Sequence, residues 1–382
     1  MRAALSIAFY ISGHGFGHAS RDIEVLNALL DRRPDLPVVV RTPAARWLFD
    51  LTLRHPVQLE SAETDTGIVQ IDSLHLDITA SVRRAACFYR DLDTRAETEA
   101  ARLGRAGTRL VVADIPPLAF RAAALAGVPA IALGNFTWDW IYDGYAQMSA
   151  DAPHLVPALR QAYETAAIAL RLPMHGGFAS IRTIRDIPWV ARQSRRDPRE
   201  VRTALGLPGD RRLALLSFGG YGLDGLDLDR VDTRGDYLLL TTGAPSPARR
   251  HPQVAQAAVT HHRNVACIDE RLLYESGLRY EDLVAAVDVV VTKPGYGIIA
   301  ECIANDTAML YTSRGRFAEY EVLVDGLPRV VRSRFISQDD LYAGRWRAPL
   351  DALLDQPPPP VRPATNGAEV AAGVILEMLD RH

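Results

Sequence analysis

Two histidines set among three glycines near the amino terminus are the residues best suited to do chemistry in this chain. The segment Gly13–His18 reads GHGFGH. Imidazole exchanges a proton near neutral pH, and glycine lets the backbone approach a ligand closely. A strand candidate, Ser6–Ile11, precedes the segment, and a helical apolar pattern over Ser20–Arg32 follows it. A strand, a glycine turn and a helix in this order open a Rossmann-like unit, whose ligand lies at the carboxyl end of the strand. We therefore expect this turn to serve catalysis as well as binding.

A second segment of the same kind, Val287–Glu301, contains the chain's single lysine, Lys293. Gly295 and Gly297 follow the lysine, and a helix then begins with its first N–H groups free. Such a helix end binds anions, because unpaired amides and the helix dipole both favour negative charge. Lys293 could place a point charge on a phosphate, and Glu301 could accept hydrogen bonds from a ribose diol. The alternative is an ordinary strand-to-helix turn in which Glu301 faces solvent.

A third glycine turn, GGYG at positions 219–222, follows the strand candidate Arg212–Phe218. A glycine turn alone is a weak indication of ligand binding. Its place directly after a strand nevertheless predicts that Gly219, Gly220 and Tyr221 contact a ligand.

Strands and helices alternate twice along the chain, on either side of a polar stretch at Arg182–Pro208. The expected strands of the first half are Ser6–Ile11, Pro37–Arg41, Gly67–Ile71, Arg109–Ala113 and Ala130–Gly134, and its longest expected helix is Val82–Leu103. Such alternation indicates parallel sheets covered by helices on both faces. The sequence therefore predicts an α/β protein with two facing Rossmann-like domains, at 1–190 and 191–365. A helix within 366–382 could cross back onto the first domain.

The composition is that of a globular protein, with 48% hydrophobic and 23% charged residues. A formal net charge of -3 argues against nucleic acid as the main partner, because phosphate backbones attract basic proteins. The pattern of a signal peptide is not apparent, and the apolar runs fall short of the roughly 18 residues that span a bilayer. Cys87, Cys267 and Cys302 have no metal-ligand spacing and are typical of core thiols in a reducing compartment. We therefore expect a cytoplasmic protein, and the sequence leaves its oligomeric state open.

His14 and His18 are four residues apart, a spacing that metal-binding histidines on a helix share. The glycines between them make a regular helix unfavourable, and a third ligand is missing from the segment. We expect no bound metal and no cofactor other than a co-substrate.

The region Asp288–Glu301, with the strand Asp306–Tyr311 and the loop Thr312–Glu321 after it, resembles the donor site of nucleotide-sugar glycosyltransferases of the GT-B fold. The similarity is to the UDP-glycosyltransferase superfamily and to MurG-like enzymes. The sequence GHGFGHASR at positions 13–21 is especially similar to the glycosyltransferase-like amino-terminal half of plant L-arabinokinases and their free-standing bacterial relatives. The resemblance covers nearly the whole chain and implies the GT-B fold.

The resemblance implies a set of donor contacts in the second domain. Lys293 stands where many plant members have a phosphate-binding histidine, and Glu301 stands on the glutamate that holds the donor ribose. The remaining implied donor contacts are Gly219, Gly220, Tyr221, Gly295, Tyr296, Gly297, Ile298, Arg314 and Glu319. The family often has an Asp/Glu-Gln pair in the loop that grips the sugar, but this chain has no glutamine there. The identity of the sugar is therefore open.

For the first domain, the resemblance implies that His18 is the general base that deprotonates an acceptor hydroxyl. Asp114, in the family-like stretch Val111–Pro117, is the implied partner that orients the imidazole. The expected acceptor contacts are His14, Gly15, Phe16, Arg21 and Trp138. Arg21 could instead be a solvated surface residue, and Trp138 a buried aromatic.

Together these features predict a metal-independent glycosyltransferase that moves a sugar from a nucleotide sugar, most simply a UDP-sugar, to a hydroxyl with inversion. Two alternatives stay open at this point. A non-hydrolysing sugar-nucleotide epimerase would use the same kind of cleft with further acid and base carboxylates. A sugar-nucleotide-binding module would bind the same ligand without turning it over.

Overall fold

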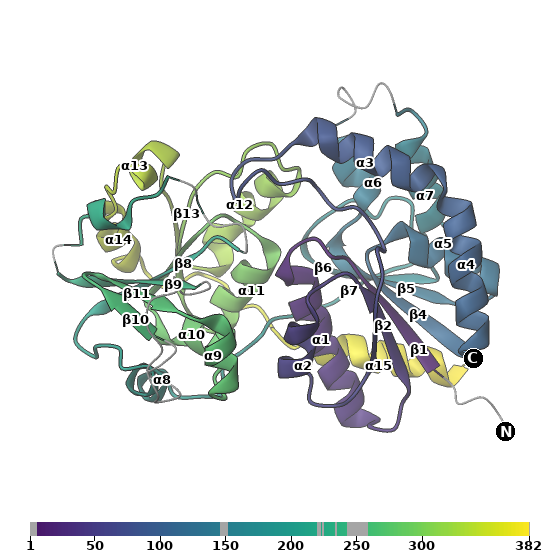
Figure 1. Cartoon of the computed structure of the whole chain (residues 1–382), viewed down its shortest axis with the longest axis horizontal. Helices are drawn as coiled ribbons and strands as arrows, with labels where there is room; N and C mark the ends of the chain where they lie inside the picture. Colours follow the sequence, from purple (N-terminus) through teal and green to yellow (C-terminus); the bar gives the residue numbers. More distant parts are fainter. Residues whose placement is uncertain are drawn as a thin grey trace.

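Two α/β domains lie side by side in the computed structural model of the chain (Figure 1). The structure describes residues 6–145, 152–219, 223, 225–233, 235–242 and 259–381. Each domain holds a seven-stranded sheet, with the order β3-β2-β1-β4-β5-β6-β7 in the first and β10-β11-β9-β8-β12-β13-β14 in the second. The paired strands run parallel except for β10 and β11. The chain is thus an α/β protein with two facing Rossmann-like domains.

The strands of the first domain are β1 (Ser6–Ile11), β2 (Val38–Thr42), β3 (Gln58–Ser61), β4 (Thr108–Asp114), β5 (Ala130–Phe136), β6 (Ile168–Gly176) and β7 (Ile184–Asp186). Its helices are α1 (Phe16–Arg32), α2 (Arg46–Thr52), α3 (Ile78–Arg90), α4 (Leu92–Arg105), α5 (Pro117–Ala126), α6 (Trp138–Asp143) and α7 (Leu155–Tyr163).

The strands of the second domain are β8 (Arg212–Ser217), β9 (Tyr237–Thr242), β10 (Val259–His262), β11 (Val265–Ile268), β12 (Val289–Thr292), β13 (Ala308–Tyr311) and β14 (Ser333–Phe335). Its helices are α8 (Pro198–Ala204), α9 (Glu270–Glu275), α10 (Tyr280–Ala286), α11 (Tyr296–Ala304), α12 (Glu319–Val330), α13 (Gln338–Tyr342) and α14 (Arg347–Leu354), with a 3-10 turn at Leu228–Arg230. The last helix, α15 (Gly367–Arg381), packs against α1 of the first domain.

Strand β1 shows why these sheets need helices on both faces. All six of its residues are buried. Ile7, Phe9 and Ile11 pack with α1 and α15, whereas Ala8 and Tyr10 pack with α3, α4 and α5 on the opposite face. A strand buried on both sides reads as a continuous apolar run, which is typical of a parallel sheet.

Strand order places the ligand-binding edge. In the first sheet the order reverses between β1 and β4, and in the second it reverses between β8 and β12. In open α/β sheets ligands bind at the carboxyl ends of the strands at such a switch point. The four turns that follow these strands therefore face the cleft between the domains.

The chain crosses between the domains twice, and the two crossings lie against each other. Val190 and Asn366 form an antiparallel bridge, and the Gly367 N–H donates to the Trp189 carbonyl at 2.9 Å. A Cβ on Gly367 would lie 2.2 Å from the Pro188 carbonyl oxygen, so the close approach requires glycine. The Trp189 ring stacks on Tyr296 at 4.9 Å, which places the crossings directly behind the cleft.

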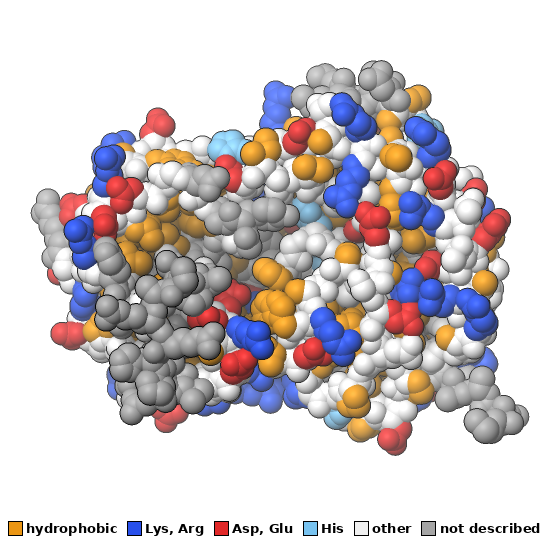
Figure 2. Space-filling view, viewed as in Figure 1, with side chains coloured by type: hydrophobic (Ala, Val, Ile, Leu, Met, Phe, Trp, Pro, Cys, Tyr) orange, Lys and Arg blue, Asp and Glu red, His pale blue; other side chains and the backbone are white. Residues whose placement is uncertain are grey.

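The face drawn in Figure 2 is hollowed between the two domains. Basic and acidic side chains are interspersed around the hollow on the described part of this face, without a patch of one sign. Among the helices of the described chain, none combines the length and the apolarity that crossing a bilayer requires.

Candidate active site

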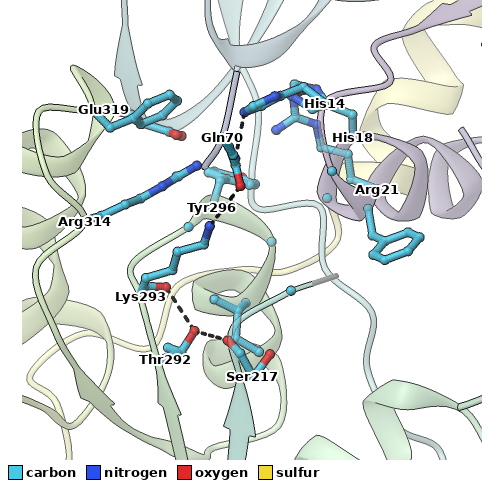
Figure 3. A pocket seen from close by; sticks show the side chains of 18 of the residues that line it. His14, His18, Arg21, Gln70, Ser217, Thr292, Lys293, Tyr296, Arg314 and Glu319 are labelled. Atoms are coloured by element: carbon cyan, nitrogen blue, oxygen red, sulfur yellow. Dashed lines mark hydrogen bonds between the residues drawn. The ribbon is translucent and has the colours of Figure 1, made fainter. Parts of the chain in front are cut away.

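A cavity of about 460 Å³ lies between the carboxyl ends of the two sheets and receives side chains from both domains (Figure 3). Most of the residues that the sequence singled out line it. From the first domain these are His14, Gly15, Phe16, His18 and Arg21, and from the second they are Gly219, Lys293, Gly295, Tyr296, Gly297, Ile298, Arg314 and Glu319. Gly220 and Tyr221 lie outside the described residues.

His18 and Asp114 form a buried pair at the first-domain side of the cavity. Asp114 is the last residue of β4 and stands in register with Ile11, the last residue of β1, so the turn after β1 brings the start of α1, with His18, next to it. The His18 Nδ1 and the Asp114 Oδ1 are 2.8 Å apart. In the tautomer that donates from Nδ1 to the carboxylate, Nε2 is the free acceptor of the ring. This is the arrangement of a general base with an orienting carboxylate.

Arg21, one turn further along α1, is committed to the same carboxylate. Its Nε and Nη2 both donate to Asp114, the latter at 2.5 Å, and its Nη1 donates to Asn135 at 2.8 Å. Burial raises the pKa of Asp114, but the charges of Arg21 and His18 outweigh burial and hold this pKa well below its usual value. Asp114 is therefore ionised, and Arg21 is a buried partner of the dyad rather than a solvated residue. The Arg21 guanidinium already donates to Asp114 and Asn135. Contact between Arg21 and an acceptor therefore stays a prediction.

Asn135 extends this network to the second domain. Its Nδ2 donates to the Glu319 Oε1 at 2.5 Å, while its Oδ1 accepts from Arg21. Glu319 is the first residue of α12 and is buried. A continuous set of hydrogen bonds thus joins His18, in one domain, to the loop of the other domain that the resemblance associates with the donor sugar. Asn135 was not among the residues predicted from the sequence, although it lies near the end of β5 at the same sheet edge.

Two cations on the second-domain side of the cavity have no carboxylate in ion-pair contact among the described residues. Burial, and then the charge of Arg314, lower the pKa of Lys293 to about 7. Burial also lowers the pKa of Arg314, whose guanidinium lies 4.0 Å from the centre of the Phe317 ring. Among the described residues, the Lys293 Nζ donates one hydrogen bond, to the Gln70 Oε1 at 3.5 Å. The charges of Glu319 and Asp72 oppose these shifts without forming ion pairs. Buried cations without an ion-pair partner are costly, so bound negative charge would be favourable on this side of the cavity.

Helix α11 adds backbone donors to these cations. It begins at Tyr296, its N-cap residue is Gly295, and no side chain caps its first amides. The Arg21 guanidinium lies over the Tyr296 ring at 5.4 Å, which fixes the start of α11 against the His18–Asp114 pair. Uncapped amides at a helix start favour an anion such as a phosphate.

Gln70 and His14 line the cavity between Lys293 and Arg314 on one side and the His18–Asp114 pair on the other. The His14 Nδ1 accepts from the Ile68 N–H at 3.3 Å, and burial, followed by the charge of Arg314, lowers the pKa of His14 well below its ordinary value. His14 is therefore neutral near pH 7. Gln70 lies in a loop, not in the strand that the sequence predicted over Gly67–Ile71, and that prediction is wrong.

Glu301 lies away from the first cavity. It lines an adjoining cavity of about 740 Å³ together with Trp47, Tyr274 and Tyr280. Burial raises the pKa of Glu301, whereas Arg192 opposes this by donating from its Nε at 2.7 Å. Glu301 does not face solvent, and contact with a ribose remains a prediction that would require sharing its carboxylate with Arg192.

Trp138 does not reach the cavity. Its side chain is fully buried, its Nε1 donates to Asp65 at 2.9 Å, and its ring packs edge-on behind His14 at 5.8 Å. The expectation of an acceptor stacked on this indole is not met in this conformation, because both ring faces are covered. Among the described residues, no cluster of three histidine, cysteine or carboxylate side chains has metal-binding geometry.

The comparisons with known proteins agree with this architecture. The chain has the GT-B glycosyltransferase fold. Over 98% of its length it superposes on 99% of UGT89C1 from Arabidopsis thaliana, solved with UDP, with a TM-score of 0.61 and 14% identity. The glycotransferase of kitacinnamycin covers the same shares of both chains with a TM-score of 0.60 and 16% identity. A putative UDP-N-acetylglucosamine 2-epimerase from Listeria monocytogenes matches 98% of the chain and 95% of its own, with a TM-score of 0.54 and 12% identity.

In sequence, the chain is 29% identical over 385 residues to L-arabinokinase from Arabidopsis thaliana, and this alignment includes 99% of the chain. The chain spans about a third, 35%, of the length of that relative. No family model matches the sequence.

Proposed function

We propose that this protein is a glycosyltransferase that moves a sugar from a nucleotide sugar, most simply a UDP-sugar, to an acceptor hydroxyl with inversion. The observation that carries the proposal is the placement of the His18–Asp114 pair across one cavity from Lys293, Arg314 and the start of α11. A base on one wall and anion-binding groups on the other are what direct displacement requires.

In the proposed reaction the acceptor oxygen attacks the anomeric carbon while the bond from that carbon to the diphosphate oxygen breaks. The acceptor proton passes to the His18 Nε2, and Asp114 stabilises the imidazolium that forms. The negative charge that develops on the leaving diphosphate is held by the α11 amides and by Lys293. Attack from the face opposite the leaving group inverts the anomeric centre.

The test is release of a nucleoside diphosphate from a panel of nucleotide sugars, with and without hydroxyl acceptors, alongside calorimetric binding. His18→Gln is expected to abolish turnover while the Kd for UDP stays within about threefold, since His18 touches the acceptor and not the diphosphate. Failure of every uridine nucleotide to bind would reject the donor. Turnover of His18→Gln at the wild-type rate would reject the base.

An epimerase is the second candidate, because Glu319 places a carboxylate in the cavity beside Arg314. An epimerase would isomerise the bound sugar without an acceptor, and Glu319→Gln would stop that isomerisation. Tight nucleotide binding without any turnover would instead favour a binding module.

A further inference from the structure

Asp22 is a buried acidic residue that the proposed reaction does not use. It lies on α1 one turn after His18, and its side chain has no solvent exposure. Neither of its oxygens accepts a hydrogen bond from any described residue. A carboxylate in such a place would lose its hydration without gaining a donor, which strongly favours the neutral acid over the unpaired buried charge.

Another acid, Asp114, interacts with Asp22. Asp22 is within hydrogen-bonding reach of Asp114, and burial, followed by the charge of Asp114, raises its pKa well above the ordinary value, with Arg21 opposing. Asp114 is itself ionised, because Arg21 and His18 hold it. Two carboxyl groups in contact do not both ionise, so the proton between them belongs to Asp22.

We propose that Asp22 is a neutral carboxylic acid that donates its O–H to the Asp114 carboxylate and acts as a positioning residue for the His18–Asp114 pair. Asp114 then receives donors from three side chains, and its carboxylate is held in the orientation that meets the imidazole. The protonation state follows from the burial of Asp22, its lack of a donor and its contact with Asp114, whereas its effect on the reaction rests on the proposed function.

The protonation state is tested by infrared spectroscopy of the ligand-free protein at pH 8. The difference spectrum of wild type minus Asp22→Asn is expected to contain the C=O stretch of a protonated carboxylic acid. The subtraction removes any contribution from other buried acids such as Asp65. A difference spectrum that shows only an ionised carboxylate would overturn the proposal, whether or not the protein is a transferase.

The positioning role is tested by NMR of the His18 ring in ¹⁵N-histidine-labelled protein. In Asp22→Asn the amide still donates to Asp114, so the Nδ1–H resonance is expected to stay near its wild-type position. In Asp22→Ala that resonance is expected to shift or broaden through exchange. Asn27→Ala is the matched control, because Asn27 is another buried polar residue of α1. Its Nδ2 donates to the Thr52 carbonyl, away from Asp114. An unchanged His18 resonance in Asp22→Ala would overturn the role.

Kinetics provide a separate readout once a substrate is found. Loss of one hydrogen bond to a charged group corresponds to a fall of about ten- to a hundredfold in kcat for Asp22→Ala, with KM nearly constant. Asp22→Asn is expected to restore most of that loss and to keep the pH profile of kcat/KM. A displaced pH profile in Asp22→Asn would mean that Asp22 carries a charge and would contradict the proposal.

Discussion

Replacing Lys293 by methionine removes the only ammonium side chain of the protein while keeping a side chain of similar length. In the folded, ligand-free protein the pKa of Lys293 falls from 10.5 to about 7. A shift of that size corresponds to on the order of 5 kcal/mol of cost for burying the charge without an anion. Above pH 7 the cavity thus holds a neutral amine that a bound anion would return to its charged, ammonium form.

The sign of the effect on stability follows from proton binding. Between pH 7 and 10.5 the unfolded chain binds the Lys293 proton and the folded chain does not. The free energy of unfolding therefore rises with pH by about 1.4 kcal/mol per pH unit in that window and is unaffected by this group below pH 7. Relative to Lys293→Met, the wild type should gain about 2–3 kcal/mol between pH 7 and 9 in urea denaturation. Lys293→Arg keeps a cation that does not titrate in this range and should behave as the methionine variant does.

The single lysine also allows a direct measurement. Protein labelled with ¹³C at the lysine ε-carbon has one resonance, whose titration midpoint reports the pKa of Lys293. We expect a midpoint near 7 without ligand, and a higher midpoint with UDP or inorganic diphosphate, because a bound anion stabilises the ammonium. A midpoint near 10.5 in the free protein, or an equal pH dependence of unfolding in wild type and Lys293→Met, would refute this reasoning.

Two further predictions concern the network around the dyad. Asp114→Asn leaves Arg21 buried without its anion, so the free energy of unfolding should fall by about 3–5 kcal/mol. The same change should lower kcat by more than about a hundredfold, because the His18 tautomer is no longer fixed. Unchanged denaturation curves would contradict the ion pair between Arg21 and Asp114. Asn135→Ala and Glu319→Ala should show a coupling of about 1 kcal/mol in a double-mutant cycle of unfolding, and strictly additive effects would mean that the contact between the domains is absent in solution.

The elements that carry the site could largely be predicted because their signals are local. The strand before Gly13, the glycine turn and the amphipathic α1 follow one another within 30 residues, and the same holds for β12 and α11. Asp114 ends β4, and His18 lies at the start of α1 just after the neighbouring strand β1, so strand order brings them together.

The groups that sequence reasoning missed depend on contacts between distant positions. The apolar residues of Gly67–Ile71 favour a strand, but Gln58–Ser61 occupies the sheet edge instead, and Gly67 adopts a φ of 58° against His14. Gln70 therefore lies in a loop that lines the cavity. The pairing of Glu301 with Arg192 joins α11 to the chain between the domains, and no spacing rule connects positions so far apart.

Asp22 and Asn135 were missed for a different reason. An aspartate inside an amphipathic helix is normally read as part of the solvated face, and its burial becomes visible only when β4 is placed beside α1. Asn135 is the second-last residue of the buried strand β5, where a polar residue indicates a hydrogen-bond partner but not which one. The tertiary structure supplies that partner from the other domain.

The packing of α15 on α1 determines which parts of the chain would move together if the two domains rotated. Ala371, Ala372 and Ile375 are buried in the core that also contains α1, and Asp380 pairs with Arg33 at 2.7 Å. Although α15 follows the second domain in the sequence, it is mechanically part of the first. Any rotation that opens the cleft would turn about the paired crossings at Val190 and Asn366 and would carry both ends of the described chain together. A probe or a protein module attached after Arg381 would therefore travel with the histidine-bearing domain, and would report its motion relative to the domain that holds Lys293.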